Sequence, residues 1–305
     1  MSKLSTFKKL WNENKYGIIV AVYYNFVHAG ITNILSDATF LKLTYRVRFG
    51  KKLNLKNPKT FNEKLQWLKL YDRNPKYVDM ADKIKAKKYV ADIIGSKYII
   101  PTLGVYDSFE QIDFEKLPNQ FVLKCNHDSG SVVICKDKSQ FNIEKAKQKL
   151  QKGLRTDAFL EGREWPYKDI DRKILAEEYL EEPGIEELRD YKLMCFNGKV
   201  KCSFVGSERF SGDGLKVTFY DRNWKPMPFE RHYPRSKKPI DKPVHYEEMV
   251  NMAEKLSDNI PFLRVDFYEV GGKVYFGELT FYPGSGWEEF TPELWDEKLG
   301  SWIEL

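Results

Sequence analysis

The stretch FLRVDFYEVGGKVYFGELTF, residues 262–281, decides the fold of this chain. Two runs rich in β-branched and aromatic residues flank Gly271-Gly272, a pair that suits a tight turn, so the stretch predicts a β-hairpin. Asp266 lies on the first strand and Glu278 on the second. If the pairing is regular, both carboxylates point inward and converge. Paired carboxylates on a rigid sheet suit Mg²⁺, which takes oxygen ligands and completes its shell with water and phosphate.

Two further polar residues share these strand faces. Arg264 shares a face with Asp266 by the two-residue alternation of a strand, and Thr280 shares a face with Glu278. Arg264 would then face anionic chemistry. The alternative is a solvated strand pair joined by cross-strand salt bridges. The glycines in the following PGSG, residues 283–286, favour a ligand site because they permit a close approach of the backbone.

A second pattern is FVLKCNHDSGSVVICK, residues 121–136, which predicts a strand, a polar glycine loop and another strand. Lys124 offers a cation, and backbone amides of such a loop can hold phosphate. The loop is no Walker motif, and an ordinary hairpin turn is the alternative. His127 and Cys125 lack a third group to orient a nucleophile, so His127 is expected to shape the loop or contact phosphate. Four loop residues would hold the phosphate: Asp128, Ser129, Gly130 and Ser131.

A third pattern joins ILAEEYLEE, residues 174–182, to the strand DYKLMCF. Glu177 and Glu178 come at the end of the first strand, while Asp190 and Lys192 share one face of the next. Acidic residues at such a junction can hold ribose hydroxyls or an adenine amino group. The alternative is a charged strand edge.

The composition excludes several classes of protein. The 305 residues carry 50 lysines and arginines against 44 acidic residues, with both signs interspersed, so a nucleic-acid partner is not expected. The four cysteines form no CxxC pair, which predicts reduced thiols rather than a zinc site. No secretory signal is visible. Cytoplasmic residence follows, with the inner face of the cell membrane as one location.

Residues 17–36 contain no lysine, arginine or acidic residue before Asp37. Apolar residues recur at helical spacing along one side and predict an amphipathic helix that docks on the protein's own core or on a partner. Peripheral association with a membrane surface and a membrane span are the alternatives. The apolar set, interrupted by polar residues, comprises Ile19, Val22, Tyr23, Phe26, Val27, Ile31 and Ile34.

The remaining chain alternates between helical and strand signals. NPKTFNEKLQWL predicts a helix start in which Thr60 and Glu63 form a capping box. Further helices are predicted for DKIKAKKYVADII, FNIEKAKQKLQKGL and HYEEMVNMAEKLSDN, and strands for KVKCSFVG and KVTFYD. A mixed α+β protein with a largely helical N-terminal region follows.

Six segments in this order resemble the ATP-grasp superfamily, and specifically its TupA-like branch, over residues 55–305: DK at 82–83, FVLKCNHDSGS, ILAEEYLEE, DYKLMCFNGK, FLRVDFYEV and YFGELTFYPGSG. The resemblance implies an ATP-grasp fold of class α+β, with two lobes holding ATP between them and an N-terminal helical extension. We expect a helical region at 1–75, a small lobe with a glycine-rich lid at 76–175, and a C-terminal lobe with the metal site at 176–305.

The resemblance also implies roles for individual residues. Lys83 and Lys124 match the two nucleotide-binding lysines, and the Asp128 to Ser131 loop matches the lid. Asp266 and Glu278 match the ligands of Mg²⁺. The hinge that holds adenine and ribose matches four residues: Glu177, Glu178, Tyr179 and Leu180. The catalytic set comprises Arg264, which would steady the transferred phosphoryl group, with Lys192 and His127.

Two positions depart from the family pattern. Thr280 stands where many ATP-grasp enzymes have asparagine, and its hydroxyl is a weaker metal ligand. Asp128 places an anion beside the lid glycine, so a compensating cation such as Lys136 or Lys138 is expected.

The activity implied by the resemblance is that of an ATP-dependent, ADP-forming carboxylate–amine ligase. It would form an amide through an acyl phosphate in capsular or teichuronic-type polysaccharide synthesis, on a saccharide or amino-acid substrate that is lipid-linked or free. Members of the branch are frequently labelled glycosyltransferases, and a transferase using a sugar nucleotide is the first alternative. A non-catalytic module that binds polysaccharide or membrane through aromatic residues is the second, with four candidates: Trp11, Trp67, Trp165 and Trp287.

Overall fold

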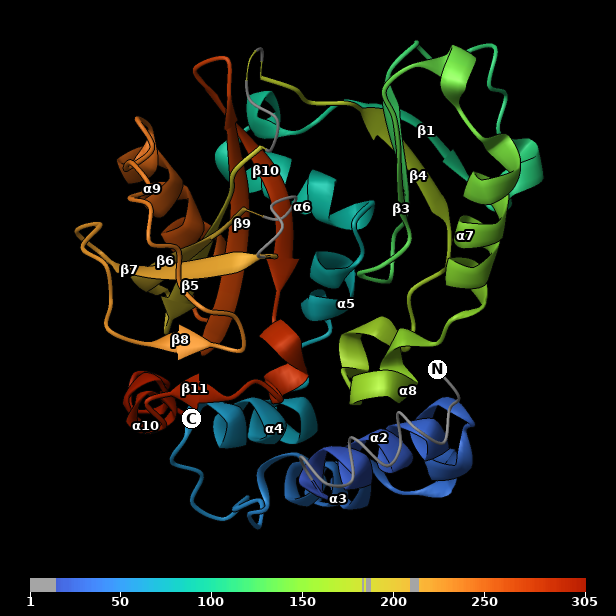
Figure 1. Ribbon diagram of the computed structural model, residues 1–305. Helices are drawn as coiled ribbons and strands as arrows, with labels where there is room; N and C mark the ends of the chain where they lie inside the picture. Colours follow the sequence, from blue (N-terminus) through green and yellow to red (C-terminus); the bar gives the residue numbers. More distant parts are fainter. Residues whose placement is uncertain (1–14, 183, 185–187, 209–213) are drawn as a thin grey trace.

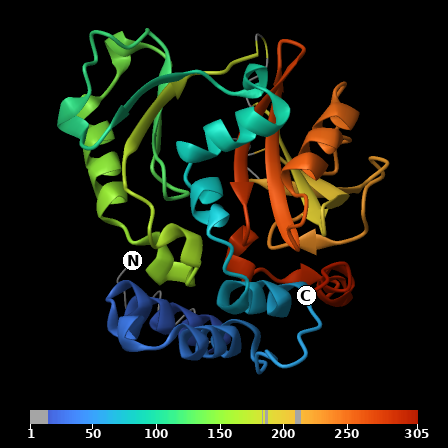
Figure 2. The same cartoon turned by 180° about the vertical axis from the view of Figure 1, so that it is seen from behind.

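Two antiparallel sheets form the body of the molecule, with two helices between them (Figure 1). The computed structural model describes residues 15–182, 184, 188–208 and 214–305. The helices between the sheets are α5 (Lys76–Ala81) and α6 (Lys85–Ile94), and the same arrangement is seen from behind in Figure 2. The architecture is α+β, as predicted. The division of the chain after residues 75 and 175 stays a prediction.

The smaller sheet has four strands in the order β1-β4-β2-β3. Helix α7 (Ile143–Arg155) packs against this sheet and buries Ala146 and Leu150 in a core with Phe121 and Ile174. Two of the predicted strands, β2 and β3, form a hairpin around the loop at 126–131. The strands are β1 (Thr102–Tyr106), β2 (Phe121–Cys125), β3 (Val132–Cys135) and β4 (Ile174–Glu178).

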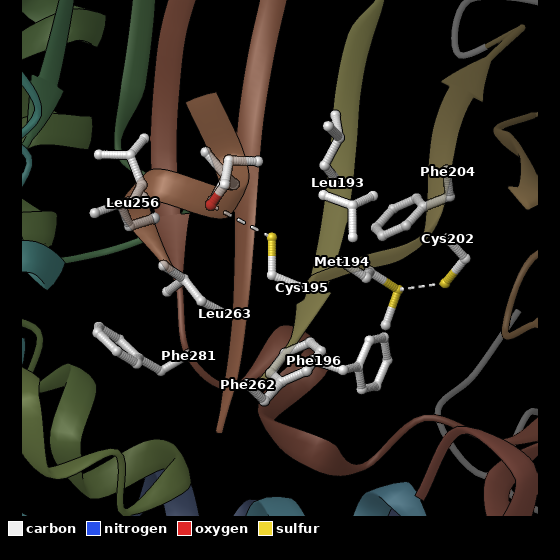
Figure 3. Packing of buried hydrophobic residues seen from close by; sticks show 14 of the residues in the cluster. Leu193, Met194, Cys195, Phe196, Cys202, Phe204, Leu256, Phe262, Leu263 and Phe281 are labelled. Carbon is white, nitrogen blue, oxygen red and sulfur yellow. Dashed lines mark hydrogen bonds between the residues drawn. The ribbon is translucent and has the colours of Figure 1, made fainter. Parts of the chain in front are cut away.

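The larger sheet has five strands in the order β10-β9-β5-β6-β7, so the predicted hairpin β9–β10 lies at one edge. Helix α9 (Tyr246–Leu256) packs against it, and Leu256 lies among Leu193, Phe262 and Leu263 in the core (Figure 3). The four cysteines are free and buried. The strands are β5 (Asp190–Phe196), β6 (Lys199–Ser207), β7 (Lys216–Asp221), β9 (Phe262–Val270) and β10 (Lys273–Thr280).

Shorter elements complete the framework. A two-stranded ladder joins β8 (Glu230–Arg231) to β11 (Phe290–Thr291). The remaining α-helices are α2 (Lys15–His28), α3 (Asp37–Phe49), α4 (Phe61–Tyr71), α8 (Ala158–Gly162) and α10 (Leu294–Gly300). The 3-10 turns are η1 (Ile31–Ile34), η2 (Ser96–Tyr98), η3 (Phe109–Gln111), η4 (Lys138–Gln140), η5 (Trp165–Tyr167) and η6 (Pro283–Gly286).

Helix α4 begins as its sequence predicts. The Thr60 hydroxyl accepts a hydrogen bond from the Glu63 amide at 3.1 Å, and the Glu63 carboxylate accepts one from the Thr60 amide at 3.3 Å. This capping box satisfies two amide donors that the first turn of a helix leaves without partners. It also fixes the direction in which Phe61 enters the core of the larger sheet, beside Phe262.

The N-terminal stretch differs from its prediction. Helix α2 ends at His28, and Gly30, with φ of 73°, directs the chain into η1. The seven apolar residues expected on one side are divided, because Tyr23 and Val27 are buried whereas the other five are exposed. The pattern was wrong because this helix is apolar on more than one face. Among the described residues, no helix is both long and apolar enough to cross a membrane.

The tryptophans proposed as a binding surface are mostly in the interior. Trp165 and Trp287 are buried, and Trp67 is half-buried against the core of the larger sheet. Trp11 lies outside the described residues. An exposed aromatic platform built from these side chains is therefore not present in the described part of the chain.

Candidate active site

A β-bulge at Gly277 brings Asp266 and Glu278 together. Near the turn the pairing is regular, from Lys273 opposite Val270 onward, but it shifts between Phe276 and Glu278 so that Glu278 lies opposite Asp266. The sequence led us to expect regular pairing. Regular pairing would have placed Glu278 opposite Val265, so that the Glu278 side chain pointed to the other face of the sheet. The extra residue of the bulge restores the shared face.

We expect Gly277→Val to lower the free energy of unfolding by about 1–3 kcal/mol. A Cβ atom at Gly277 would lie 3.1 Å from the Asp266 carbonyl oxygen, which is too close for an unstrained backbone contact. Urea denaturation followed by circular dichroism measures the change. Lys273→Val, at an exposed position on the same strand, is the control and should change stability by less than about 0.5 kcal/mol. Equal stability of the two variants would contradict the role given to Gly277.

Arg264 holds the two carboxylates in place. Its Nε donates to Asp266 Oδ1 and its Nη2 donates to Asp266 Oδ2, both at 2.7 Å. The same Nη2 donates to Glu278 Oε1 at 2.6 Å. On the neighbouring strand β5, Lys192 Nζ donates to Asp266 Oδ2 at 2.8 Å and also pairs with Asp190. Asp266 is buried, whereas the Glu278 side chain is 36% exposed, so Glu278 is the more accessible carboxylate.

The surrounding cations keep both carboxylates ionised at neutral pH. Burial alone would raise the pKa of Glu278, but the positive charges around it dominate and lower this pKa to about 2. Burial raises the pKa of Asp266 to about 6, with Arg264 and Lys192 opposing the rise. The cations that act on Glu278 are Arg264, Lys83, Lys192 and Lys124.

Lys83 is fixed at the junction of α5 and α6. Its amide donates to the Asn126 carbonyl at 3.1 Å, and the preceding Asp82 accepts a hydrogen bond from the Asn126 side chain at 2.9 Å. These bonds attach the start of α6 to the end of β2. The Lys83 ammonium donates to the Asp128 carbonyl in the loop. Burial lowers the pKa of Lys83, and Glu278 opposes that effect.

Lys124 shares a carboxylate with a lysine that the sequence patterns did not single out. Glu177 on β4 is buried and pairs with Lys124 on β2 and, at 2.6 Å, with Lys87 on α6. Burial alone would raise the pKa of Glu177, but the two lysines outweigh it and lower the pKa. Lys87 lies four residues after Lys83, near the start of α6, and this spacing is the signal by which it was detectable.

The loop at 126–131 is closed on itself by Asp128. The Asp128 carboxylate accepts hydrogen bonds from the amide and the hydroxyl of Ser131. The compensating cations expected for it lie elsewhere, since Lys138 donates to the Leu117 carbonyl and Lys136 stands over the Tyr179 ring. The Asp128 carboxylate is therefore engaged with the loop's own donors.

His127 packs beneath this loop. Its Nε2 lies 3.1 Å from the Thr156 carbonyl oxygen, an acceptor, so the ring donates its Nε2 proton there. Its Nδ1 is buried without a hydrogen-bond partner among the described residues. Burial lowers the pKa of His127, which favours the neutral ring. A phosphate contact through Nδ1 would require the ring to gain a proton.

A cavity of about 670 Å³ lies between the two sheets and the N-terminal helices. It brings several predicted residues together: Lys83, His127, Asp128, Ser129, Gly130, Ser131, Arg264, Glu278 and Thr280. Asp266 stands behind this lining in its ion pair with Arg264, and Lys192 in turn pairs with Asp266. Lys124 and Glu177 pair with each other outside the lining. The hinge residues lie apart from the cavity, with Glu178 exposed and Tyr179 and Leu180 half-buried.

The model of the TupA-like ATP-grasp family matches residues 63–304. The chain belongs to this family. The resemblance and the ATP-grasp fold expected from the sequence are thereby confirmed, and the match includes both carboxylates, both lysines and the loop. No curated protein matches the chain.

Solved ATP-grasp structures are more distant. The D-alanine–D-alanine ligase from Bacillus anthracis complexed with ATP has a TM-score of 0.40 at 18% identity, over 67% of this chain and 55% of that one. The D-alanine–D-alanine ligase from Helicobacter pylori has a TM-score of 0.42 at 16% identity, over 81% and 70%. N5-carboxyaminoimidazole ribonucleotide synthetase from Thermus thermophilus has a TM-score of 0.38 at 12% identity, over 66% of this chain and 45% of that one. The chain spans little more than half the length of the first of these.

The donor set of this ATP-grasp chain fits Mg²⁺ held jointly with phosphate. The described residues contain no group of three or more histidine, cysteine or acidic side chains that would enclose a metal ion. Mg²⁺ does not need such a group when nucleotide oxygens and water complete its shell. Two ionised carboxylates converge here, and the neighbouring Asp190 has a buried Oδ1 without a hydrogen-bond partner among the described residues.

The sequence pattern PGSG indicated one part of the far side of the cavity, since Gly284 of η6 lines it. The patterns missed the rest of that side, which is built by α2, by α7 and by the segment around Glu164. Ser285 in η6 has a left-handed φ of 55° and is held there by Lys69, whose Nζ donates to its carbonyl at 2.8 Å and to its hydroxyl at 3.0 Å. Lys69 is fully buried on α4. Such contacts join segments far apart in sequence and leave no periodic signal.

Proposed function

We propose that this ATP-grasp chain is an ATP-dependent, ADP-forming carboxylate–amine ligase. The observation that carries the proposal is the convergence of Asp266 and Glu278 under Arg264, in the wall of a cavity that also contains Lys83 and the loop at 128–131. A cluster of four cations around two ionised carboxylates suits a triphosphate with its metal ion.

The proposed reaction transfers the terminal phosphoryl group of ATP to a carboxylate, and an amine then displaces phosphate from the acyl phosphate to form an amide. Bound Mg²⁺ would neutralise phosphate charge and would be held by Asp266 and Glu278, with the Thr280 hydroxyl beside them. Arg264 and Lys83 would stabilise charge on the phosphoryl oxygens. Lys192 would hold Asp266 ionised and oriented.

The nucleotide itself would lie between the sheets. Lys83 and Lys124 would contact its phosphates, and the amides of the loop at 128–131 would cover them. Glu177 to Leu180 would hold adenine and ribose at the end of β4, where the chain crosses from one sheet to the other. Glu177 pairs with Lys124 in the structure.

We expect hydroxylamine trapping to test the proposal without knowledge of the natural amine. The enzyme is incubated with ATP, Mg²⁺, hydroxylamine and a panel of uronic acids and amino acids. A hydroxamate that forms together with ADP, and only with one class of carboxylate, is the expected result. Release of UDP from a UDP-sugar in the absence of ATP would instead identify a glycosyltransferase and overturn the proposal.

We further propose that the product belongs to a capsular or teichuronic-type cell-surface polysaccharide, made on the cytoplasmic side of the membrane. The substrate would be a saccharide or an amino acid, free or lipid-linked. Deleting the gene and comparing the masses of polysaccharide repeat units tests this role. A repeat unit that loses an amide-linked substituent supports it, and an unchanged repeat unit contradicts it.

A further inference from the structure

Helix α2 exposes an apolar stripe beside its buried residues. Ile19, Val22 and Phe26 recur at helical spacing and are all exposed, whereas Tyr23 and Val27 face the interior. The stripe continues into η1 with Ile31 and with Ile34, whose side chain is 90% exposed. A helix of a globular protein normally presents charged residues to water, and α2 has none between its first residue and its end at His28.

Helix α3 adds positive charge to the same layer. It packs on α2 through a hydrogen bond of 2.6 Å between the Tyr23 and Thr44 hydroxyls. Its outward residues are Lys42, Leu43 and Arg46. Figures 1 and 2 both show α2 and α3 as one layer at an end of the molecule, on the side away from the strands.

Positive charge is concentrated in this part of the chain. Residues 15–60 carry eight lysines and arginines against one acidic residue, a larger excess than the +6 of the whole chain. The remaining residues are therefore net negative. Such an asymmetry favours contact with an anionic surface through this end of the molecule.

We propose that the outer face, formed by Ile19, Val22, Phe26, Ile31, Ile34, Lys42, Leu43 and Arg46, docks on the surface of an anionic lipid bilayer. Apolar side chains of such a helix enter the boundary between headgroups and acyl chains, while neighbouring basic residues contact the headgroups. A second copy of the chain fits less well, because it would bring two strongly positive regions together. This proposal does not depend on the ligase activity.

The docked helix would also take part in the cavity. Tyr24, Val27 and His28, on other faces of α2, line the cavity that holds Arg264 and Glu278. One helix would thus contact the bilayer with one face and a substrate with another. This arrangement would suit a substrate that is itself held at the membrane.

Co-sedimentation of the full chain with vesicles tests the proposal. We expect binding to vesicles of phosphatidylcholine and phosphatidylglycerol, and much weaker binding to phosphatidylcholine alone. The double variant Val22→Glu, Phe26→Glu should bind the anionic vesicles at least about tenfold more weakly, because it removes apolar area and adds negative charge. Lys42→Gln with Arg46→Gln should weaken binding about tenfold. Far-ultraviolet circular dichroism checks that the variants are folded.

Matched variants elsewhere on the surface serve as controls. The control for the apolar pair is the double variant Val105→Glu, Leu294→Glu, which adds the same charge. Val105 and Leu294 are 42% and 59% exposed, close to the 41% and 47% of Val22 and Phe26. Lys237→Gln with Lys238→Gln is the control for the basic pair. Both control variants should bind the vesicles as the wild type does.

Three results would overturn the proposal. The first is a wild-type chain that does not bind anionic vesicles. The second is an α2 variant that binds them as well as its control does. The third is a wild-type chain that is a dimer by light scattering and does not bind vesicles, together with an α2 variant that is a monomer. The face would then join two copies of the chain.

Discussion

Glu278→Gln is expected to reduce ATP-dependent turnover by about a thousandfold or more while leaving a folded protein. Glutamine keeps the shape of the side chain and still offers one oxygen to Arg264, but it removes the negative charge that would hold Mg²⁺. The pKa of Glu278 is lowered to about 2, so the wild-type carboxylate is ionised throughout the working pH range. Coupled detection of ADP, at saturating ATP and Mg²⁺, measures the loss.

Glu247→Gln is the matched control. The pKa of Glu247 is also lowered to about 2, because Arg222 and Lys242 donate hydrogen bonds to its carboxylate, but this group lies on the surface away from the cavity. Turnover should be unchanged in this variant. If Glu278→Gln retained the turnover of the control, the metal site proposed here would be wrong.

The elements of the fold were predictable where the signal is local. The capping box at Thr60 and the glycine pair at the β9–β10 turn each depend on neighbours within a few residues, and both are present. The strands β2 and β5 and the helix α7 were also predictable, because their apolar residues recur with the period of the element. The family model confirms the superfamily that these segments resemble.

The geometry of the site depended on information that such patterns lack. A regular hairpin would have separated Asp266 from Glu278, and a single glycine, Gly277, reverses that outcome through a bulge. Nothing in the alternation of the strand indicates which glycine bulges. The pairing of Lys87 with Glu177 and the burial of Lys69 likewise arise from packing between distant segments. The apolar faces of α2 were misassigned because composition cannot tell which face meets the core.

Lys124→Met is expected to weaken ATP binding by about a hundredfold, which corresponds to about 2.7 kcal/mol. Lys124 is the penultimate residue of strand β2, two residues before the loop at 126–131, and its ammonium pairs with Glu177. A bound triphosphate would replace this carboxylate as its partner. Methionine removes the cation while keeping most of the volume of the side chain. Isothermal titration calorimetry with ATP measures the affinity.

Lys87→Met separates nucleotide binding from stability. Lys87 pairs with the same carboxylate at 2.6 Å, but it also donates to the Ile100 carbonyl at 2.7 Å and to the Thr102 hydroxyl at 2.8 Å, so it joins α6 to the start of β1. Both variants leave Glu177 with one cation, and each should lose about 1–3 kcal/mol of unfolding free energy in urea. Only Lys124→Met should also lose ATP affinity, because only Lys124 would contact the phosphates. A general loosening of the smaller sheet would instead lower the ATP affinity of both variants alike. Equal losses of affinity would mean that Lys124 acts through the structure of the sheet rather than by contact with phosphate.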